Sequence, residues 1–249
     1  MKKNLLQKTL YEINQQKQLA GYKIIENGDG FIILWNHPAL YYYSKAHCDT
    51  LTEQNYTFFK ENFPFQTLGI AANHRSSLET LNPDLVFEGT SDTMLLEQSI
   101  PLKENSKFKV RLVENKDDIK TFCQIATDVF NHPEICDKLT ESLIEDLKVK
   151  HCHKYIGYDG NEAAGIVEFS EGKEAVFICW VAVKQQFRKK GLCHAMMSYA
   201  INREIERKFN KFVLVSSADG KNVYKLLGFQ DLALRYNYTL KCRKEIDDE

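Results

Sequence analysis

The sequence predicts a mixed α+β protein built from two domains. Its 249 residues exceed the ~100–200 residues of an ordinary single domain. Short runs of β-branched and aromatic residues alternate with segments of helical periodicity along the chain. Because 43% of the residues are apolar, the chain can bury a core, and this excludes an intrinsically disordered protein.

Charge and cysteine content limit the partners and the compartment. The 33 basic and 34 acidic residues leave a formal net charge of −1, so we expect no nucleic-acid partner. Seven widely spaced cysteines without a Cys-x-x-Cys indicate free thiols in a reducing compartment. The longest apolar run, 175–183, is less than half of the ~20 residues that a membrane helix needs. We therefore expect a cytoplasmic protein with no membrane partner.

Residues 1–104 are expected to form the smaller α+β domain. The polar segment 5–19 indicates a surface helix. Asn27-Gly28 predicts a hairpin between two apolar runs, because Asn-Gly tolerates positive φ. The further elements expected are strands at 40–43, 68–72 and 85–96 and helices at 50–63 and 76–81. The polar segment 101–106 is the best linker candidate, so the second domain is expected over 107–249.

The second half predicts a strand near 110–112, two helices and an antiparallel meander. Asp117 is expected to cap a helix through residue 130, and Thr140 a helix through residue 149. The meander strands are expected at 154–158, 163–169 and 175–183. The elements expected after them are a helix following Gly191, a strand at 212–215, a short helix at 221–227 and a strand at 232–240.

The most informative stretch follows the buried strand that ends at Val183. A basic loop leads to Gly191, which opens a helix. Such a loop gathers unpaired backbone N–H groups and the positive end of a helix, and this combination binds phosphate. Gly191 lets the backbone approach an anion, and Arg188, Lys189 and Lys190 add positive charge. Taken alone, such a loop is more often an ordinary solvated turn.

Two motifs in order change this interpretation. Residues 188–193 read Arg-Lys-Lys-Gly-Leu-Cys between a strand and a helix. Residues 216–229 place a strand end, a short helix and Tyr-x-x-Leu-Gly-Phe in succession. Together, over about 107–241, they resemble the signatures of the GNAT family of acyl-CoA-dependent N-acyltransferases. Cys193 stands where that family usually has Gly or Ala, and an asparagine common after the fifth strand is replaced by Ser217 or displaced to Asn222.

The resemblance implies a GNAT fold in the second half, with acetyl-CoA as co-substrate. In that fold the fourth and fifth strands splay apart, and the pantetheine arm pairs with backbone here supplied by Val181, Ala182 and Val183. A backbone N–H near Val181 would polarise the thioester carbonyl while an amine attacks directly. The residues implied at the CoA phosphates are Arg188, Lys189, Lys190, Gly191, Leu192, Cys193 and His194, with Asn222 as a further contact.

The resemblance also places Tyr224 at the general-acid position near the departing sulfur. A phenol with the ordinary pKa of about 10 is protonated at neutral pH and can donate to a thiolate. The alternative interpretation is a half-buried packing tyrosine on a short helix. Glu168 and Glu174 are interpreted as surface carboxylates rather than as a general base.

Part of the first half repeats the order of predicted elements found in the second half. Residues 68–96 predict a strand, a short helix and a strand, as residues 213–240 do. Together with the resemblance of the second half to the GNAT family, this repeated order implies a degenerate GNAT-like domain over 1–104. It has no Arg-x-x-Gly-x-Gly/Ala motif, so it is not expected to bind CoA and is expected to shape the acceptor cleft. The consecutive tyrosines 41–43 would line that cleft or pack on both faces of a strand.

No metal site is expected. His151, Cys152 and His153, with His132 and Cys136 upstream, do not match zinc-finger or zinc-ribbon spacing, and a polar loop is the preferred interpretation. A Cys193–His194 dyad is disfavoured because adjacent residues on a helix diverge.

The leading hypothesis is an N-acetyltransferase that uses acetyl-CoA and a small-molecule or peptide amine. The alternatives are a non-catalytic acyl-CoA-binding or sensing protein of the same fold and a protein-interaction module with a vestigial CoA motif. Tyr224 and the intact 188–191 loop favour the enzyme.

Overall fold

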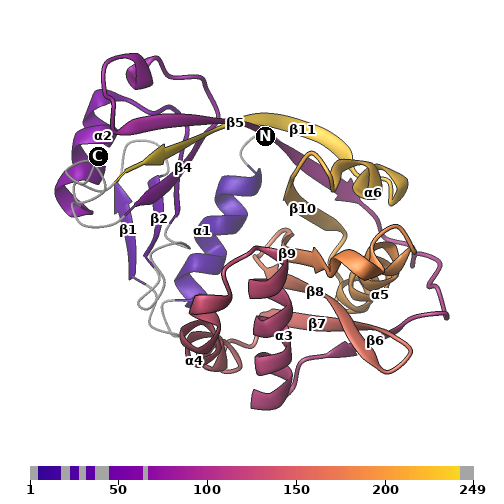
Figure 1. Ribbon diagram of the computed structural model, residues 1–249. Coiled ribbons are helices and arrows are strands. Elements are labelled where there is room, and N and C mark those ends of the chain that lie inside the picture. Colours follow the sequence, from indigo (N-terminus) through magenta and orange to yellow (C-terminus); the bar gives the residue numbers. More distant parts are fainter. Residues whose placement is uncertain (1–4, 18–22, 28–31, 37–44, 64–66, 242–249) are drawn as a thin grey trace. The chain divides into compact units, whose positions relative to one another are not determined.

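The computed structural model describes residues 5–17, 23–27, 32–36, 45–63 and 67–241. The chain divides into two compact units, whose elements are labelled in Figure 1. Unit 1 contains residues 1–20 and 94–232, and unit 2 contains residues 21–93 and 233–249. The strand expected at 40–43, with its three tyrosines, lies outside the described residues.

Unit 1 is built on a mixed sheet with the strand order β11-β5-β10-β9-β8-β7-β6. The strands are β5 (Leu85–Glu97), β6 (Lys109–Leu112), β7 (Cys152–Asp159), β8 (Glu162–Glu171), β9 (Val176–Val183), β10 (Lys211–Ser216) and β11 (Gln230–Leu240). The pairs β7–β8 and β8–β9 are antiparallel, which confirms the predicted meander. β10 is parallel to β9.

The helices of unit 1 are α1 (Leu5–Lys17), α3 (Lys116–Val129), α4 (Cys136–Asp146), α5 (Leu192–Glu206) and α6 (Lys221–Leu226). Two expected caps are wrong. The N-cap of α3 is Asn115, whose side chain accepts from the Asp118 N–H, because the helix begins one residue before Asp117. Thr140 lies inside α4 and donates to the Cys136 carbonyl, since the helix begins after a short 3₁₀ turn at Pro133–Ile135.

Helices cover both faces of the unit 1 sheet. Lys154 of β7 contacts Asp146 at the end of α4. Tyr155, the next residue of β7, packs against Tyr199 of α5 with ring centroids 5.9 Å apart. Because adjacent strand residues point to opposite faces, α4 and α5 lie on opposite sides of the sheet.

The N-terminal helix α1 belongs to unit 1 and is not the expected surface helix. Its polar residues Gln7, Thr9, Glu12 and Asn14 are buried together with its leucines. The β8–β9 turn supplies partners, because Glu12 accepts from the Lys173 N–H and Lys8 pairs with Glu174. The turn thus satisfies Glu12, while Thr9 donates to the Leu5 carbonyl of its own helix. The polar composition of this segment predicted an exposure that the structure does not show.

The strands of unit 2 follow the sheet order β1-β2-β3-β4-β11-β5. Its remaining elements are β1 (Lys23–Asn27), β2 (Ile32–Asn36), β3 (Lys45–Cys48), α2 (Glu53–Asn62), β4 (Leu68–Ala72) and a 3₁₀ turn at Leu78–Thr80. β1 pairs with β2 in antiparallel register, as the Asn-Gly hairpin predicted. The core of the unit includes Phe59, Ile70 and Tyr238.

The two units do not follow the expected linear division at residues 104–107. Residues 94–104 and α1 cluster with unit 1, whereas residues 233–241 cluster with unit 2. The reason is strand pairing: β5 and β11 each contribute residues to both units, and a polar linker between periodic segments carries no information about pairing.

Candidate active site

The strands β9 and β10 separate at the carboxyl end of β9. Their parallel pairing joins Val176 to Phe212 and ends where Ile178 pairs with Leu214. β9 nevertheless continues to Val183 and β10 to Ser216. The last residues of β9, Val181 to Val183, therefore do not pair with β10, as the expected splaying requires.

A β-bulge distorts β9 beyond the point where its pairing with β10 ends. Ile166 pairs with Ala182 and Glu168 with Cys179, so Trp180 and Val181 together oppose the single residue Val167. Trp180 adopts a φ of 53°, a left-handed value that is uncommon for a bulky residue. Such a bulge interrupts the regular ladder and bends the strand that carries it.

The loop after β9 ends in a helix N-terminus with unpaired amides. Gly191 is the N-cap of α5 with a φ of 92°, and Lys189 also has a positive φ, of 60°. The Ala195 N–H bonds to the Gly191 carbonyl, so the N–H groups of Leu192, Cys193 and His194 precede the first helical bond. A Cβ at Gly191 would have no heavy atom nearer than 3.8 Å, which leaves room for a ligand.

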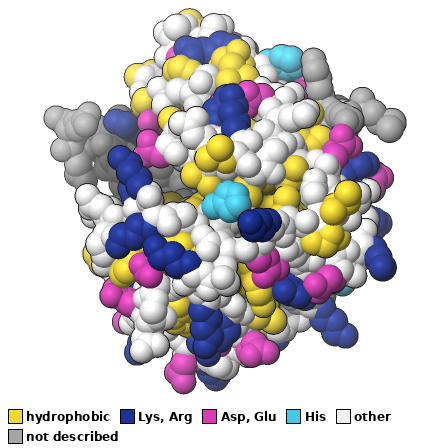
Figure 2. All heavy atoms as spheres, turned by 90° about the vertical axis from the view of Figure 1, so that its right-hand side faces the viewer, with side chains coloured by type: hydrophobic (Ala, Val, Ile, Leu, Met, Phe, Trp, Pro, Cys, Tyr) yellow, Lys and Arg dark blue, Asp and Glu magenta, His cyan; other side chains and the backbone are white. Residues whose placement is uncertain are grey.

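The basic side chains of this loop have different surroundings. The Arg188 Nε donates to the Val183 carbonyl at 3.0 Å, which ties the loop to the end of β9. Lys190 lies 4.0 Å from Asp159 and over the Phe187 ring, while Lys189 is exposed. On the face of the molecule that Figure 2 shows, lysine and arginine side chains lie among apolar and acidic ones.

Tyr224 and Cys193 come together near the start of α5. Tyr224 of α6 is 7% exposed, and its ring packs against Phe229 at 5.9 Å. Burial, with a smaller contribution from the Cys193 thiol, raises the pKa of Tyr224 above its ordinary value. Burial also raises the pKa of Cys193 to about 12, so this cysteine is a neutral thiol and no nucleophile. Asn222 is exposed on the first turn of α6.

An aromatic cluster lies beside the bulge and was not anticipated from the sequence. The Trp180 ring lies 6.4 Å from Phe122 and 5.9 Å from Phe130, both from the α3 region. Phe130 is 43% exposed. The positive φ of Trp180 sets the direction of this side chain, and no local sequence signal marks such a conformation.

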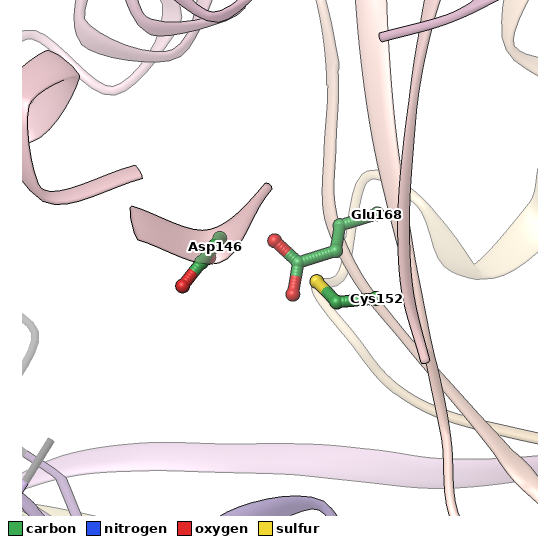
Figure 3. Close-up of side chains that lie close together, drawn as sticks. All are labelled: Asp146, Cys152 and Glu168. Carbon is green, nitrogen blue, oxygen red and sulfur yellow. The ribbon is translucent and has the colours of Figure 1, made fainter. Parts of the chain in front are cut away.

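The two carboxylates considered as a general base have other roles. Glu168 is completely buried, so its interpretation as a surface carboxylate is wrong. Figure 3 shows Glu168 beside Cys152, with Asp146 opposite. The Lys154 ammonium lies 2.8 Å from Asp146 and 3.1 Å from Glu168, and it donates to Cys152 at 3.1 Å. This buried lysine takes the position that a metal ion would need. Glu174 is exposed and pairs with Lys8.

Cys152 and His153 begin β7, so the polar-loop interpretation of this segment is wrong. Alternation along the strand sends His153 to the face opposite Cys152, where it lies 3.1 Å from Glu204 and 3.5 Å from Glu171. Burial raises the pKa of Glu204, and Arg207 at 3.0 Å supplies a counter-charge. Among the described residues these groups form an ion network that already contains its own cation.

Comparison with known proteins identifies the class. Residues 119–229 match the model of the acetyltransferase (GNAT) family. A functionally unknown conserved protein from Staphylococcus epidermidis has a similar structure, with 13% identity, a TM-score of 0.68, and coverage of 89% of this chain and 94% of that chain. A GCN5-related N-acetyltransferase from Kribbella flavida has 12% identity and a TM-score of 0.64, covering 94% and 96% of the two chains.

A tandem GNAT protein from the clavulanic acid biosynthesis pathway is also similar, with 9% identity, a TM-score of 0.57, and coverage of 87% and 81%. No curated protein sequence matches the chain. The predicted fold is therefore confirmed: residues 119–229 form a GNAT acetyltransferase domain, and the fold of most of the chain is that of GNAT proteins, tandem ones included. No helix among the described residues is long and apolar enough to cross a membrane.

Proposed function

We propose that unit 1 transfers an acetyl group from acetyl-CoA to the amine of a small molecule or peptide. The observation that carries the proposal is the end of β9–β10 pairing at Ile178 and Leu214, next to the unpaired amides at the start of α5. An extended amide chain that ends in a diphosphate is complementary to an open strand edge followed by a helix N-terminus.

The diphosphate would bind the amides of Leu192, Cys193 and His194. Anions are stabilised at a helix N-terminus by free N–H groups and by the helix dipole. Gly191 supports this assignment because its positive φ and open surroundings let phosphate oxygens approach the backbone. Lys189 and Lys190 would add charge, whereas Arg188 holds the loop against Val183.

The pantetheine amides would pair with the exposed edge of Val181, Ala182 and Val183. A backbone N–H near Val181 would donate to the thioester oxygen as negative charge develops there. The amine attacks the carbonyl carbon, the C–S bond breaks, and the amine proton passes to solvent. Tyr224 would protonate the departing thiolate, and its raised pKa keeps that proton available.

The test is binding and turnover by a loop variant. Gly191→Asp places a carboxylate where the diphosphate would lie, and we expect it to abolish the thermal shift caused by acetyl-CoA. Gly89→Asp is the matched control, because Gly89 also has a positive φ, of 119°, with open space around it. The control should lose stability while keeping the shift. A thermal shift that persists in Gly191→Asp contradicts the site.

Turnover separates the two functions that share this site. Release of free CoA in a screen of amines and peptides, lost in Gly191→Asp and kept in Gly89→Asp, is expected of the enzyme. Tight acetyl-CoA binding with no CoA release from any amine or peptide would favour the acyl-CoA-binding protein instead.

A further inference from the structure

Unit 2 buries an arginine that has no acidic partner among the residues that the structure describes. Arg235 of β11 is 1% exposed. Its Nη2 donates to the Ala71 carbonyl at 2.6 Å and lies 3.2 Å from His47 Nδ1. Nε and Nη1 are buried without a hydrogen-bond partner. A guanidinium has five N–H donors, so three of them face no acceptor within the described part of the chain.

The register explains how the cationic groups gather. His47 pairs with Ala71 across β3–β4, and Ala71 pairs with Asn237 across β4–β11. Arg235 lies two residues from Asn237 and therefore shares its face. Lys45 shares that face with His47, while Tyr236 and Tyr238 point into the core on the other side. Arg235, His47 and Lys45 therefore lie on the face of this sheet opposite the one that packs against the core.

The neighbouring groups do not neutralise Arg235. His47 is 7% exposed, and burial, Arg235 and Lys45 hold its pKa well below 6.5, so its ring is neutral. Its Nδ1 faces an arginine N–H and accepts, which leaves the ring proton on Nε2. Lys45 is exposed and brings no negative charge. Burial raises the pKa of Cys48 to about 12, so this thiol brings no negative charge.

A buried charge without a counter-charge is unfavourable, because the desolvation of the ion is not repaid. Elsewhere in the described part of unit 2, arginine and lysine do find acids: Arg75 pairs with Glu79 at 2.6 Å, and Lys60 with Asp84 at 2.6 Å. Arg235 differs from these groups because three of its donors have no acceptor in the described part of the chain. This difference indicates a negatively charged group that is not part of the described chain.

We propose that Arg235, with His47 and Lys45, binds a small oxyanion, the carboxylate or phosphate group of a ligand. Charge-assisted hydrogen bonds from the free arginine donors would supply most of the affinity. This site lies in unit 2 and does not depend on acyl transfer by unit 1.

The first test is the thermal stability of the full-length chain in chloride, acetate and inorganic phosphate at equal ionic strength. We expect acetate, phosphate or both to raise the unfolding temperature in a saturable way, and the two arms distinguish a carboxylate site from a phosphate site. In Arg235→Met this rise should disappear, while stability in chloride should be equal or higher because an unpaired buried charge is gone.

Arg75→Met is the matched control, an arginine of the same unit whose partner is present. It should keep the full response to the oxyanion. The proposal is overturned if the wild-type chain responds to neither anion, or if Arg235→Met retains the response.

A second measurement separates binding from a purely structural role. The titration of His47, followed by NMR and assigned with His47→Gln, should move to higher pH when the oxyanion binds, because negative charge favours the imidazolium. If Arg235 has only a structural role, the titration of His47 should not change when acetate or phosphate is added. That result would also contradict the proposed site.

Discussion

Tyr224 combines a buried ring with a hydroxyl that makes no hydrogen bond to any residue described in the structure. Most buried tyrosines satisfy the hydroxyl group. The nearby Cys193 is neutral and offers little as an acceptor. The phenol is therefore free to donate to a group that arrives with the substrate, as a general acid must.

We expect Tyr224→Phe to lower turnover by a factor on the order of 10²–10⁴ if proton donation limits the reaction, with little change in acetyl-CoA affinity. Because the pKa is raised, loss of this proton should begin only as pH rises beyond the ordinary tyrosine value of about 10. The measurement is kcat against pH in both proteins. An unchanged kcat, where chemistry limits turnover, would assign Tyr224 to packing.

At this scale, the sequence predicted backbone positions better than side-chain surroundings. Gly191 opens α5 with positive φ, as a glycine at that position suggested. Glu168 could not be placed, because its burial depends on Lys154 and on Asp146 from another element. Arg235 carried no signal either, since its neighbours come from strands far away in the chain.

Two glycines of the sheet allow the helix α5 to pack closely against it. A Cβ at Gly157 would lie 2.4 Å from the Met196 Sδ, and one at Gly165 would lie 2.7 Å from the Met196 Cε. Gly165 has a second constraint, the Ala182 carbonyl oxygen at 2.9 Å. Gly165 therefore fixes both the helix and the bulged end of β9.

We expect Gly165→Ala to lower the free energy of unfolding by about 1–3 kcal/mol, the usual cost of overpacking. It should also weaken acetyl-CoA binding, because Ala182 must move. Adding Met196→Ala should relieve Gly157→Ala, whose nearest obstacles are side-chain atoms, but not Gly165→Ala, whose obstacles include the Ala182 carbonyl oxygen. Chemical denaturation and acetyl-CoA titration of the four variants test this. Equal rescue of both would contradict the role given to Ala182.

Regular elements with clear periodicity were predictable, and their partners were not. The meander and the strand–loop–helix order around Gly191 follow from local patterns. The surroundings of α1 do not, because its buried Glu12 is satisfied by the Lys173 backbone, far away in sequence. Local composition predicts that a segment is helical, but it does not predict which surface the helix packs against.

At the scale of the whole molecule, neither unit is a continuous segment. Unit 1 needs α1 and residues 94–97 of β5 as well as the family-matched residues 119–229. Met94 and Leu96 are buried in its core. A cut at residue 107 therefore removes core side chains and a strand next to β10.

We expect the fragment 107–249 to unfold at a lower temperature than the intact chain and with less cooperativity. A matched chain, in which residues 1–20 are joined to 94–232 by a short flexible linker, should recover a cooperative transition and acetyl-CoA binding. Calorimetry of the three proteins is the measurement. If fragment 107–249 melts like the intact chain, α1 and β5 are not needed by unit 1.

The position of β11 has a consequence for synthesis on the ribosome. Residues 68–72 of β4 pair with residues 236–240, so β4 has no β11 neighbour until more than 160 further residues have been translated. An unpaired strand edge is a template for wrong pairing. Unit 2, although it begins near the start of the chain, can therefore close only after the nascent polypeptide has released its last strand from the exit tunnel.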